Sequence, residues 1–252
     1  MIWVVQALRG NIEQVRARIA AAAERAGRDP GDVTLVAVTK TVPARRVRMA
    51  WELGLTDFGE NRVQEAVEKI PLVISKEKSE IRSPKPVLSP VEVSEVRWHL
   101  IGHLQRNKVR HAIPLFDMVH SVDSVRLARE IDRRAGLAGK AMPVLIEVNV
   151  AGEASKYGFA PQALGEAVRQ IADLPSVTIG GLMTVAPITE DTEAARPFFR
   201  RLRRLRDGLA EQFPDIDWRH LSMGMTDDFE VAIEEGATLV RIGRAIFGER
   251  GE

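Results

Sequence analysis

The sequence predicts an α/β protein, a (β/α)₈ barrel of the TIM type with an extra N-terminal helix, on three grounds. Short apolar runs rich in β-branched residues alternate with helical patterns along most of the chain. The alternation occurs eight times, and 252 residues is a usual length for one such barrel. A doubly wound sheet is the competing architecture, but it would normally need fewer strands or an obvious second domain. We therefore expect residues 1–252 to form a single domain.

The elements follow one another in a regular order. An alanine-rich stretch with interleaved Arg and Glu, residues 11–26, predicts the extra helix, which Gly27 ends. The predicted strands are 33–39, 56–59, 98–101, 117–121, 143–150, 177–183, 219–222 and 238–242. The helices predicted to follow them are 44–53, 61–70, 105–113, 124–136, 161–173, 192–212, 227–235 and 244–248. Strands alternating with helices in this way are typical of a parallel barrel.

Residues 71–97 interrupt this pattern. They contain four prolines and five serines among alternating charges, with no aromatic residue and no glycine. This composition is typical of linkers and loops, so we expect a flexible insertion within the barrel. A long loop can also serve as a lid, but we favour the plain insertion.

Composition excludes several classes of protein. A net charge of +1 argues against a dedicated nucleic-acid surface, and the absence of cysteine excludes disulfides and thiolate metal sites. The five histidines show no close metal-binding spacing, so no metal is expected. We find neither a signal-type apolar core nor a stretch long enough to span a bilayer, and therefore expect a cytoplasmic protein without membrane contact. A local basic cluster on a predicted helix is interpreted as a solvated face: Arg200, Arg201, Arg203, Arg204 and Arg206.

Lys40 follows the apolar run LVAVT at 35–39, which predicts a strand buried in a parallel sheet. Its side chain should emerge at the rim where α/β barrels keep their ligand sites. Partial removal from water there favours a neutral, nucleophilic amine that can form an imine with an aldehyde. The alternative is a lysine that caps the strand and extends into solvent.

The turns after the last two strands predict an anion site. In LSMGMTDD at 221–228 a strand runs into a Ser/Gly turn, and in LVRIGRAI at 239–246 a strand passes through one glycine into a helix. Glycine lets the backbone approach an anion, and a helix N-terminus offers free N–H groups. The loops after strands seven and eight of (β/α)₈ barrels recurrently bind phosphate, although tight turns alone would also explain these glycines. With Lys40 at the same rim, the pattern favours a ligand that carries both a phosphate and an aldehyde.

Pyridoxal 5′-phosphate fits that description, and long motifs point to a family that binds it. The motifs are AVTKT at 37–41, GENRVQE at 59–65, WHLIGHLQRNK at 98–108, VNVAGEASKYGF at 148–159, GLMTVAP at 181–187 and LSMGMTDDFEVAIEEGATLVRIGRAIFG at 221–248. In this order they resemble the pyridoxal-phosphate homeostasis proteins of the YggS/PROSC type. The barrel of that family is similar to the N-terminal domain of alanine racemase. The resemblance covers nearly everything except 71–97 and the chain ends.

The resemblance implies roles for three residues around the cofactor ring. Lys40 matches the lysine that holds pyridoxal phosphate as a Schiff base. Arg241 matches the arginine that faces the pyridine nitrogen, and Asn61 lies at a matching position near the ring.

The resemblance also implies a phosphate cradle, formed by Ser222, Gly224, Gly243 and the backbone of Arg244. Two positions depart from the family pattern. His103 stands where many relatives carry proline, and Arg244 where many carry threonine. The second departure removes a side-chain hydroxyl from the cradle, although the N–H remains and a guanidinium could serve instead.

The implied function is cofactor homeostasis, that is, binding, storage and delivery of pyridoxal phosphate without turnover. An arginine at the pyridine nitrogen weakens the ring as an electron sink. Racemisation also needs a second acid/base, which related racemases take from an added domain. This chain stops soon after the eighth unit, so we expect no such domain. Its only tyrosine, Tyr157, fits an aromatic lid contact better than a catalytic base. Recipient PLP-dependent apo-enzymes are candidate partners, and we expect a monomer. The alternatives are a PLP-dependent racemase of the alanine racemase type and a cofactor-free barrel aldolase that uses Lys40.

Overall fold

The computed structural model describes residues 2–75, 95–153, 156–187, 189 and 191–248. Within these residues the strands close into one barrel in sequence order, and every neighbouring pair is parallel, including the first with the last. The strands are β1 (Thr34–Val38), β2 (Asp57–Glu60), β3 (Arg97–Leu100), β4 (Met118–Val122), β5 (Met142–Glu147), β6 (Val177–Met183), β7 (His220–Ser222) and β8 (Leu239–Ile242). The predicted (β/α)₈ barrel is confirmed.

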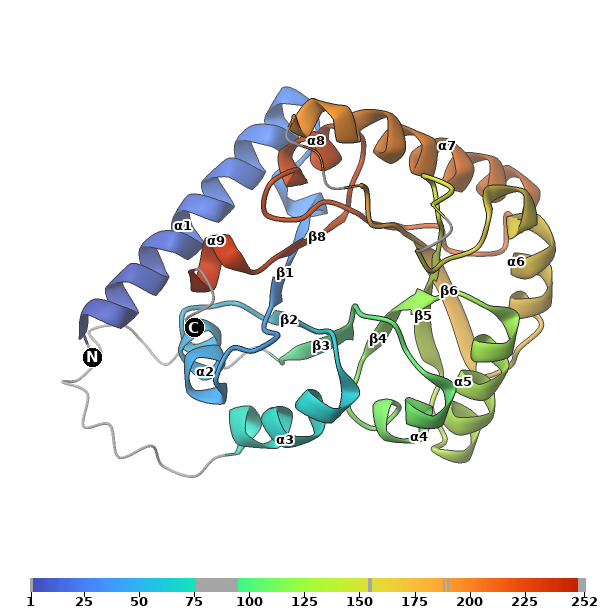
Figure 1. Ribbon diagram of the computed structural model, residues 1–252, viewed down its shortest axis with the longest axis horizontal. Coiled ribbons are helices and arrows are strands. Elements are labelled where there is room, and N and C mark those ends of the chain that lie inside the picture. Colours follow the sequence, from blue (N-terminus) through green and yellow to red (C-terminus); the bar gives the residue numbers. More distant parts are fainter. Residues whose placement is uncertain (1, 76–94, 154–155, 188, 190, 249–252) are drawn as a thin grey trace.

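Helices surround the barrel on the outside (Figure 1). They are α1 (Ile2–Arg25), α2 (Ala44–Glu52), α3 (Val63–Ile74), α4 (Val109–Ala112), α5 (Val125–Leu137), α6 (Leu164–Ala172), α7 (Arg196–Gln212), α8 (Phe229–Glu234) and α9 (Arg244–Phe247). Short 3₁₀ turns precede β1, α4, α6 and α7: η1 (Pro30–Asp32), η2 (Arg106–Lys108), η3 (Pro161–Ala163) and η4 (Thr192–Ala195). None of the helices in the described part of the chain is long and apolar enough to traverse a bilayer.

The extra N-terminal helix is longer than the sequence predicted. It begins at Ile2 rather than at residue 11, and it lies along α8 and α9 (Figure 1). Gly10 weakens the local helical preference, but packing compensates for it. Leu8 is buried in the core, and the Asn11 side chain donates to the Ile246 carbonyl at 3.0 Å.

The helix and the strand that flank the expected insertion at 71–97 both extend into it. α3 continues through Pro71 to Ile74, because Val73 is fully buried. Arg48 of α2 also donates to two carbonyls at the end of α3, those of Leu72 and Ser75, at 2.6 and 2.7 Å. At the other end β3 begins at Arg97. The rest of the segment, 76–94, lies outside the described residues.

The interior of the barrel combines a small apolar layer with polar side chains. Val36, Leu145, Met183 and Leu239 form a buried cluster separate from the main core, which lies between the strands and the helices. Trp98 of β3 faces outward and packs on Phe58 of β2, with ring centroids 5.4 Å apart. The next residue, His99, points inward because side chains alternate along a strand.

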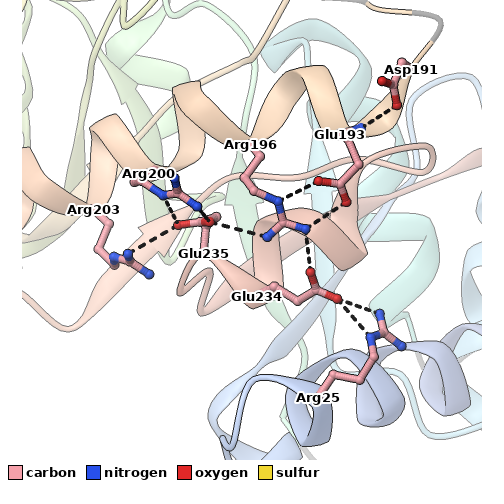
Figure 2. Close-up of polar contacts among 8 residues, drawn as sticks. All are labelled: Arg25, Asp191, Glu193, Arg196, Arg200, Arg203, Glu234 and Glu235. Carbon is pink, nitrogen blue, oxygen red and sulfur yellow. Dashed lines mark hydrogen bonds and ion pairs between the residues drawn. The ribbon is translucent and has the colours of Figure 1, made fainter.

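The predicted basic face on α7 is partly exposed but is held by specific contacts. Glu235, just after α8, accepts from Arg196, Arg200 and Arg203 at 3.3, 2.7 and 3.3 Å (Figure 2). Arg201 donates to the Val150 carbonyl at 2.7 Å. These arginines therefore join α7 to neighbouring parts of the barrel rather than only facing solvent.

Candidate functional site

Lys40 lies at the carboxyl-terminal rim of the barrel, two residues beyond the end of β1, and is partly buried. The residue after it, Thr41, has a φ of 63°, a left-handed conformation that is uncommon for a residue other than glycine. Such a conformation persists only when the surroundings hold it.

Three charged residues hold the backbone on both sides of Lys40. The buried amine of Lys69, on α3, donates to the Thr39 carbonyl at 2.6 Å and lies 2.7 and 2.6 Å from the carboxylates of Glu60 and Glu65. Glu65 also accepts from the Thr41 N–H at 2.6 Å. Sequence reasoning did not assign these residues a role, although Glu60 and Glu65 lie within the GENRVQE motif.

The glycines predicted for the phosphate cradle are both closely packed, and Gly224 also has a left-handed backbone. Gly224 has a φ of 91°, and a Cβ there would lie 2.6 Å from the Ala232 Cβ. A Cβ on Gly243 would lie 3.2 Å from both the Cβ and the carbonyl oxygen of Val38. Val38 is the last residue of β1, so Gly243 brings the end of β8 directly beside the segment that carries Lys40.

Arg244 begins α9, and its Nη2 donates to both carboxylate oxygens of Asp227, at 2.5 and 2.7 Å. Both side chains are largely exposed, and they connect the loop after β7 to the helix after β8. The guanidinium at this departure from the family pattern therefore has a structural contact of its own.

Arg241, on β8, is almost fully buried with its guanidinium inside the barrel. It donates to Ser222 Oγ at 2.6 Å and to the Thr184 carbonyl at 2.9 Å. Burial lowers the pKa of Arg241 to about 10, while the charges of Asp228 and Glu147 oppose the shift, so the group stays cationic near neutral pH. Ser222 lies at the end of β7, at the predicted rim. Besides accepting from Arg241, its hydroxyl oxygen lies 2.9 Å from His120 Nδ1.

Some buried polar atoms at this rim have no partner among the described residues. They include Asn61 Oδ1 and Glu147 Oε2. Burial and the charge of Asp123 raise the pKa of Glu147 to about 7, although Arg241 opposes this. Buried polar atoms in proteins nearly always have partners, so these two are suited to contact a polar ligand.

His103, the other departure from the family pattern, joins the loops after β3, β4 and β5. Its Nδ1 lies 3.0 Å from Asp123 Oδ2, and its ring stacks on Tyr157 with centroids 3.7 Å apart. Tyr157 is mostly exposed, which fits the wall of a site rather than a buried base.

The residues present fit a phosphorylated aldehyde. The described rim combines a lysine, two closely packed glycines, a buried cationic arginine and buried polar atoms without a partner among the described residues. Together with the closed parallel barrel, these features define the class of the protein, which is that of barrels of the alanine racemase N-terminal type. The family model for the alanine racemase N-terminal domain matches residues 6–251.

Within that class, the chain belongs to the family of pyridoxal phosphate homeostasis proteins. The member from Aquifex aeolicus (strain VF5) is 43% identical over 239 residues, which cover 95% of this chain and 96% of that protein. The member from Escherichia coli (strain K12) is 40% identical over 243 residues, 95% of each chain. The resemblance inferred from the motifs is therefore confirmed.

Solved structures agree. An unknown protein from Bifidobacterium adolescentis superposes with a TM-score of 0.85 at 37% identity, covering 97% of this chain and 96% of that one. PipY of Synechococcus elongatus PCC7942, solved with PLP bound, superposes with a TM-score of 0.78 at 32% identity, covering 96% of this chain and 100% of that one. Alanine racemase of Clostridium difficile 630 superposes with a TM-score of 0.73 over 58% of its own chain. Its sequence identity is only 14%, so this likeness shows the fold alone.

Proposed function

We propose that this protein binds pyridoxal 5′-phosphate through a Schiff base on Lys40 and acts in homeostasis of the cofactor by binding, storing and delivering it. The observation that carries the proposal is the close approach of Gly243, which follows the strand with the buried Arg241, to Val38, two residues before Lys40. It is supported by the names of the relatives and by the PLP held in PipY. When bound, the cofactor supplies an aldehyde that a primary amine captures reversibly and a ring that can accept electrons.

The residues of this chain divide the binding task. Lys40 supplies the amine, and the bonds to the Thr39 carbonyl and the Thr41 N–H hold the backbone from which its side chain extends. Backbone N–H groups at Gly224, Gly243 and Arg244 are the donors for the phosphate, with Ser222 beside them. Asn61 lies one residue beyond β2, at the edge of the same rim.

Arg241 faces the pyridine nitrogen in this proposal. A guanidinium is a donor without a proton to give near neutral pH, so it hydrogen-bonds the nitrogen and leaves it unprotonated. An unprotonated ring is a weak electron sink, and carbanion chemistry on a bound amino acid is correspondingly slow. This feature favours a carrier over an enzyme. The racemase alternative rests only on distant relatives that share the fold.

The first test is to locate the cofactor. Incubation with pyridoxal phosphate should give a visible absorption band, and mass spectrometry after borohydride reduction should place the adduct on Lys40. Lys40→Ala should abolish the adduct and retain the fold, whereas the control Lys156→Ala should retain both. An adduct on Lys156 or Lys108 would refute the assignment, and a colourless protein would favour the aldolase.

The second test separates a carrier from a racemase. The loaded protein is incubated with L-alanine in D₂O while NMR follows the α-proton and chiral chromatography follows D-alanine. We expect no more than traces of exchange, because general acid–base catalysis contributes about 10²–10⁴-fold. Turnover on the order of 1 s⁻¹ or faster, within the usual enzyme range, would favour the racemase.

The proposal also includes a monomeric, cytoplasmic protein that delivers the cofactor to PLP-dependent apo-enzymes. Light scattering on the purified protein, cell fractionation and transfer of the absorption band to an added apo-enzyme test these points in turn. A stable dimer, a membrane-bound fraction or a failure to activate any apo-enzyme would each contradict the corresponding point.

A further inference from the structure

A line of hydrogen bonds crosses the barrel interior beneath Arg241. Ser222 Oγ lies 2.6 Å from Arg241 Nη1 and 2.9 Å from His120 Nδ1. His120 Nε2 lies 3.0 Å from His99 Nδ1, and His99 Nε2 lies 3.0 Å from Asp57 Oδ1. Ser222 ends β7 and Asp57 begins β2, so the line extends from the ligand rim to the opposite end of the barrel.

Donor chemistry assigns this line a direction. A guanidinium only donates, so Ser222 Oγ accepts from Arg241 and has its own hydrogen left for His120 Nδ1. His120 is fully buried, and burial lowers its pKa well below the ordinary value, with His99, Arg241 and His220 adding to the effect. A neutral His120 with a free Nδ1 carries its proton on Nε2 and donates it to His99 Nδ1. His99 in turn donates from Nε2 to the carboxylate of Asp57.

The far end of the line is anchored and reaches water. Arg97, whose side chain is 59% exposed, forms a two-pronged pair with Asp57, with both distances 2.8 Å. Burial raises the pKa of Asp57, but bonds from His99, Arg97 and Thr56 outweigh it and hold the pKa well below the usual range. A cavity of about 440 Å³, lined in part by Asp57, Arg97 and Thr34, opens beside this end.

We propose that Asp57, His99 and His120 are positioning residues for the ligand site, which act through Ser222 to hold Arg241 from inside the barrel. The inference rests on the proposed function, in which Arg241 meets the pyridine nitrogen. All bonds in the line point the same way, so Ser222 always presents an acceptor to Arg241. The guanidinium is therefore held at Ser222 and at the Thr184 carbonyl, and cannot turn away from the rim.

The charged or titratable groups that face the two imidazoles are Asp57, Arg97, His220 and Arg241.

The ligand-free protein provides the first test. Long-range ¹⁵N–¹H NMR of ¹⁵N-histidine protein distinguishes the two tautomers directly. At pH 8 we expect His120 to carry its proton on Nε2, with Nδ1 free to accept from Ser222. An Nδ1–H form of His120 would overturn the proposal.

A pair of matched variants provides the second test. His120→Phe removes the link, while His111→Phe changes an exposed histidine that accepts from Arg110 at 2.8 Å and lies outside the line. Loss of one supporting hydrogen bond should weaken pyridoxal phosphate binding roughly two- to tenfold in His120→Phe only. The pH profile of the visible band should also shift in that variant and not in the control. A folded His120→Phe with wild-type affinity and profile would refute the positioning role.

The two proposals can fail separately. If the wild-type protein does not bind pyridoxal phosphate, the proposed function is wrong, and the tautomer measurement still decides whether the line exists as described. If His120→Phe does not fold, the wild-type tautomers again decide. If the wild type binds and the tautomers are reversed, only the positioning role is lost.

Discussion

Glu147 ends β5 with one carboxylate oxygen buried and without a partner among the described residues. Burial and Asp123 raise the pKa of this carboxyl from an ordinary 4.5 to about 7 in the folded protein. Between these values the folded protein keeps a proton that the unfolded chain has released. Stability therefore falls as pH rises through this window and is constant above it. The full effect is on the order of 3 kcal/mol.

Glu147→Gln removes the ionisation, so the ligand-free variant should be more stable than wild type by about 1–3 kcal/mol at pH 8. The difference should vanish near pH 4, where the wild-type carboxyl is protonated in both states. Urea unfolding at both pH values measures it, with the exposed Glu68→Gln as the control. An equal effect at the two pH values would contradict the assignment.

Gly243 is the residue at which a side chain should interfere most directly with the ligand. Added bulk would meet Val38 at the end of β1 and displace the backbone beside Lys40. Gly243→Val should weaken pyridoxal phosphate binding by roughly ten- to a hundredfold or more, because bonds to a charged phosphate are lost. Dialysis and absorbance measure it. Gly208→Val, at a glycine of α7 with nothing within 4 Å of its Cβ position, should bind normally; equal losses in both variants would exclude a local effect.

At the scale of elements, the ion pairs between α7, α8 and α1 are the clearest stabilising feature. Glu235 is nearly buried and accepts from three arginines of α7, while Glu234 joins Arg196 to Arg25 of α1 (Figure 2). Burial raises the pKa of Glu235, but bonds from Arg200 and Arg196 outweigh it and lower the pKa overall. Its contribution is therefore present above the ordinary carboxyl range and is lost as pH falls below it.

We predict that Glu235→Gln costs about 1–3 kcal/mol of the free energy of unfolding at pH 7. We expect a value near the lower end of this range, because the three arginines are partly exposed and water screens their charges. The control is Glu193→Gln, whose side chain is 58% exposed and whose carboxylate pairs with Arg196 among the described residues; its loss of stability should be clearly smaller. Chemical denaturation of both variants compares them, and a larger loss in the control would mean that burial of Glu235 adds nothing.

Element boundaries show where local patterns are insufficient. Strand positions were predicted within a few residues, since β-branched apolar runs are local signals. The start of α1 and the end of α3 were not, because each depends on a contact from a distant segment. Asn11 donates to the carbonyl of Ile246, which lies in α9, and Arg48 donates to carbonyls near the end of α3.

For the whole molecule, the two ends of the barrel have separate roles. Lys40, Gly224 and Gly243 lie where strands end. The connection from α3 to β3 leaves α3 after Ile74 and enters β3 at Arg97, and the start of a parallel strand lies at the opposite end of the barrel. A segment inserted there is attached far from the ligand rim.

We predict that replacement of residues 76–94 by a short Gly/Ser linker preserves pyridoxal phosphate binding. The reasons are the place of attachment and a composition that cannot bury a core. The linker variant should show the absorption band of wild type, and Lys40→Ala in the same background should lose it. A folded linker variant without the band would show that the segment acts as a lid.

By itself, the sequence determined the barrel, the order of its strands and the expectation that Lys40, Gly224 and Gly243 follow strand ends at one rim. Periodicity, glycine turns and the alternation of strands with helices are local signals, and a parallel barrel brings all strand ends to one side. Only the tertiary structure decided that His99 and His120 lie in line beneath Arg241. Those residues come from separate strands and meet only because barrel closure and strand register bring them together. No short-range pattern carries that register, so the support of the site had to be observed in three dimensions.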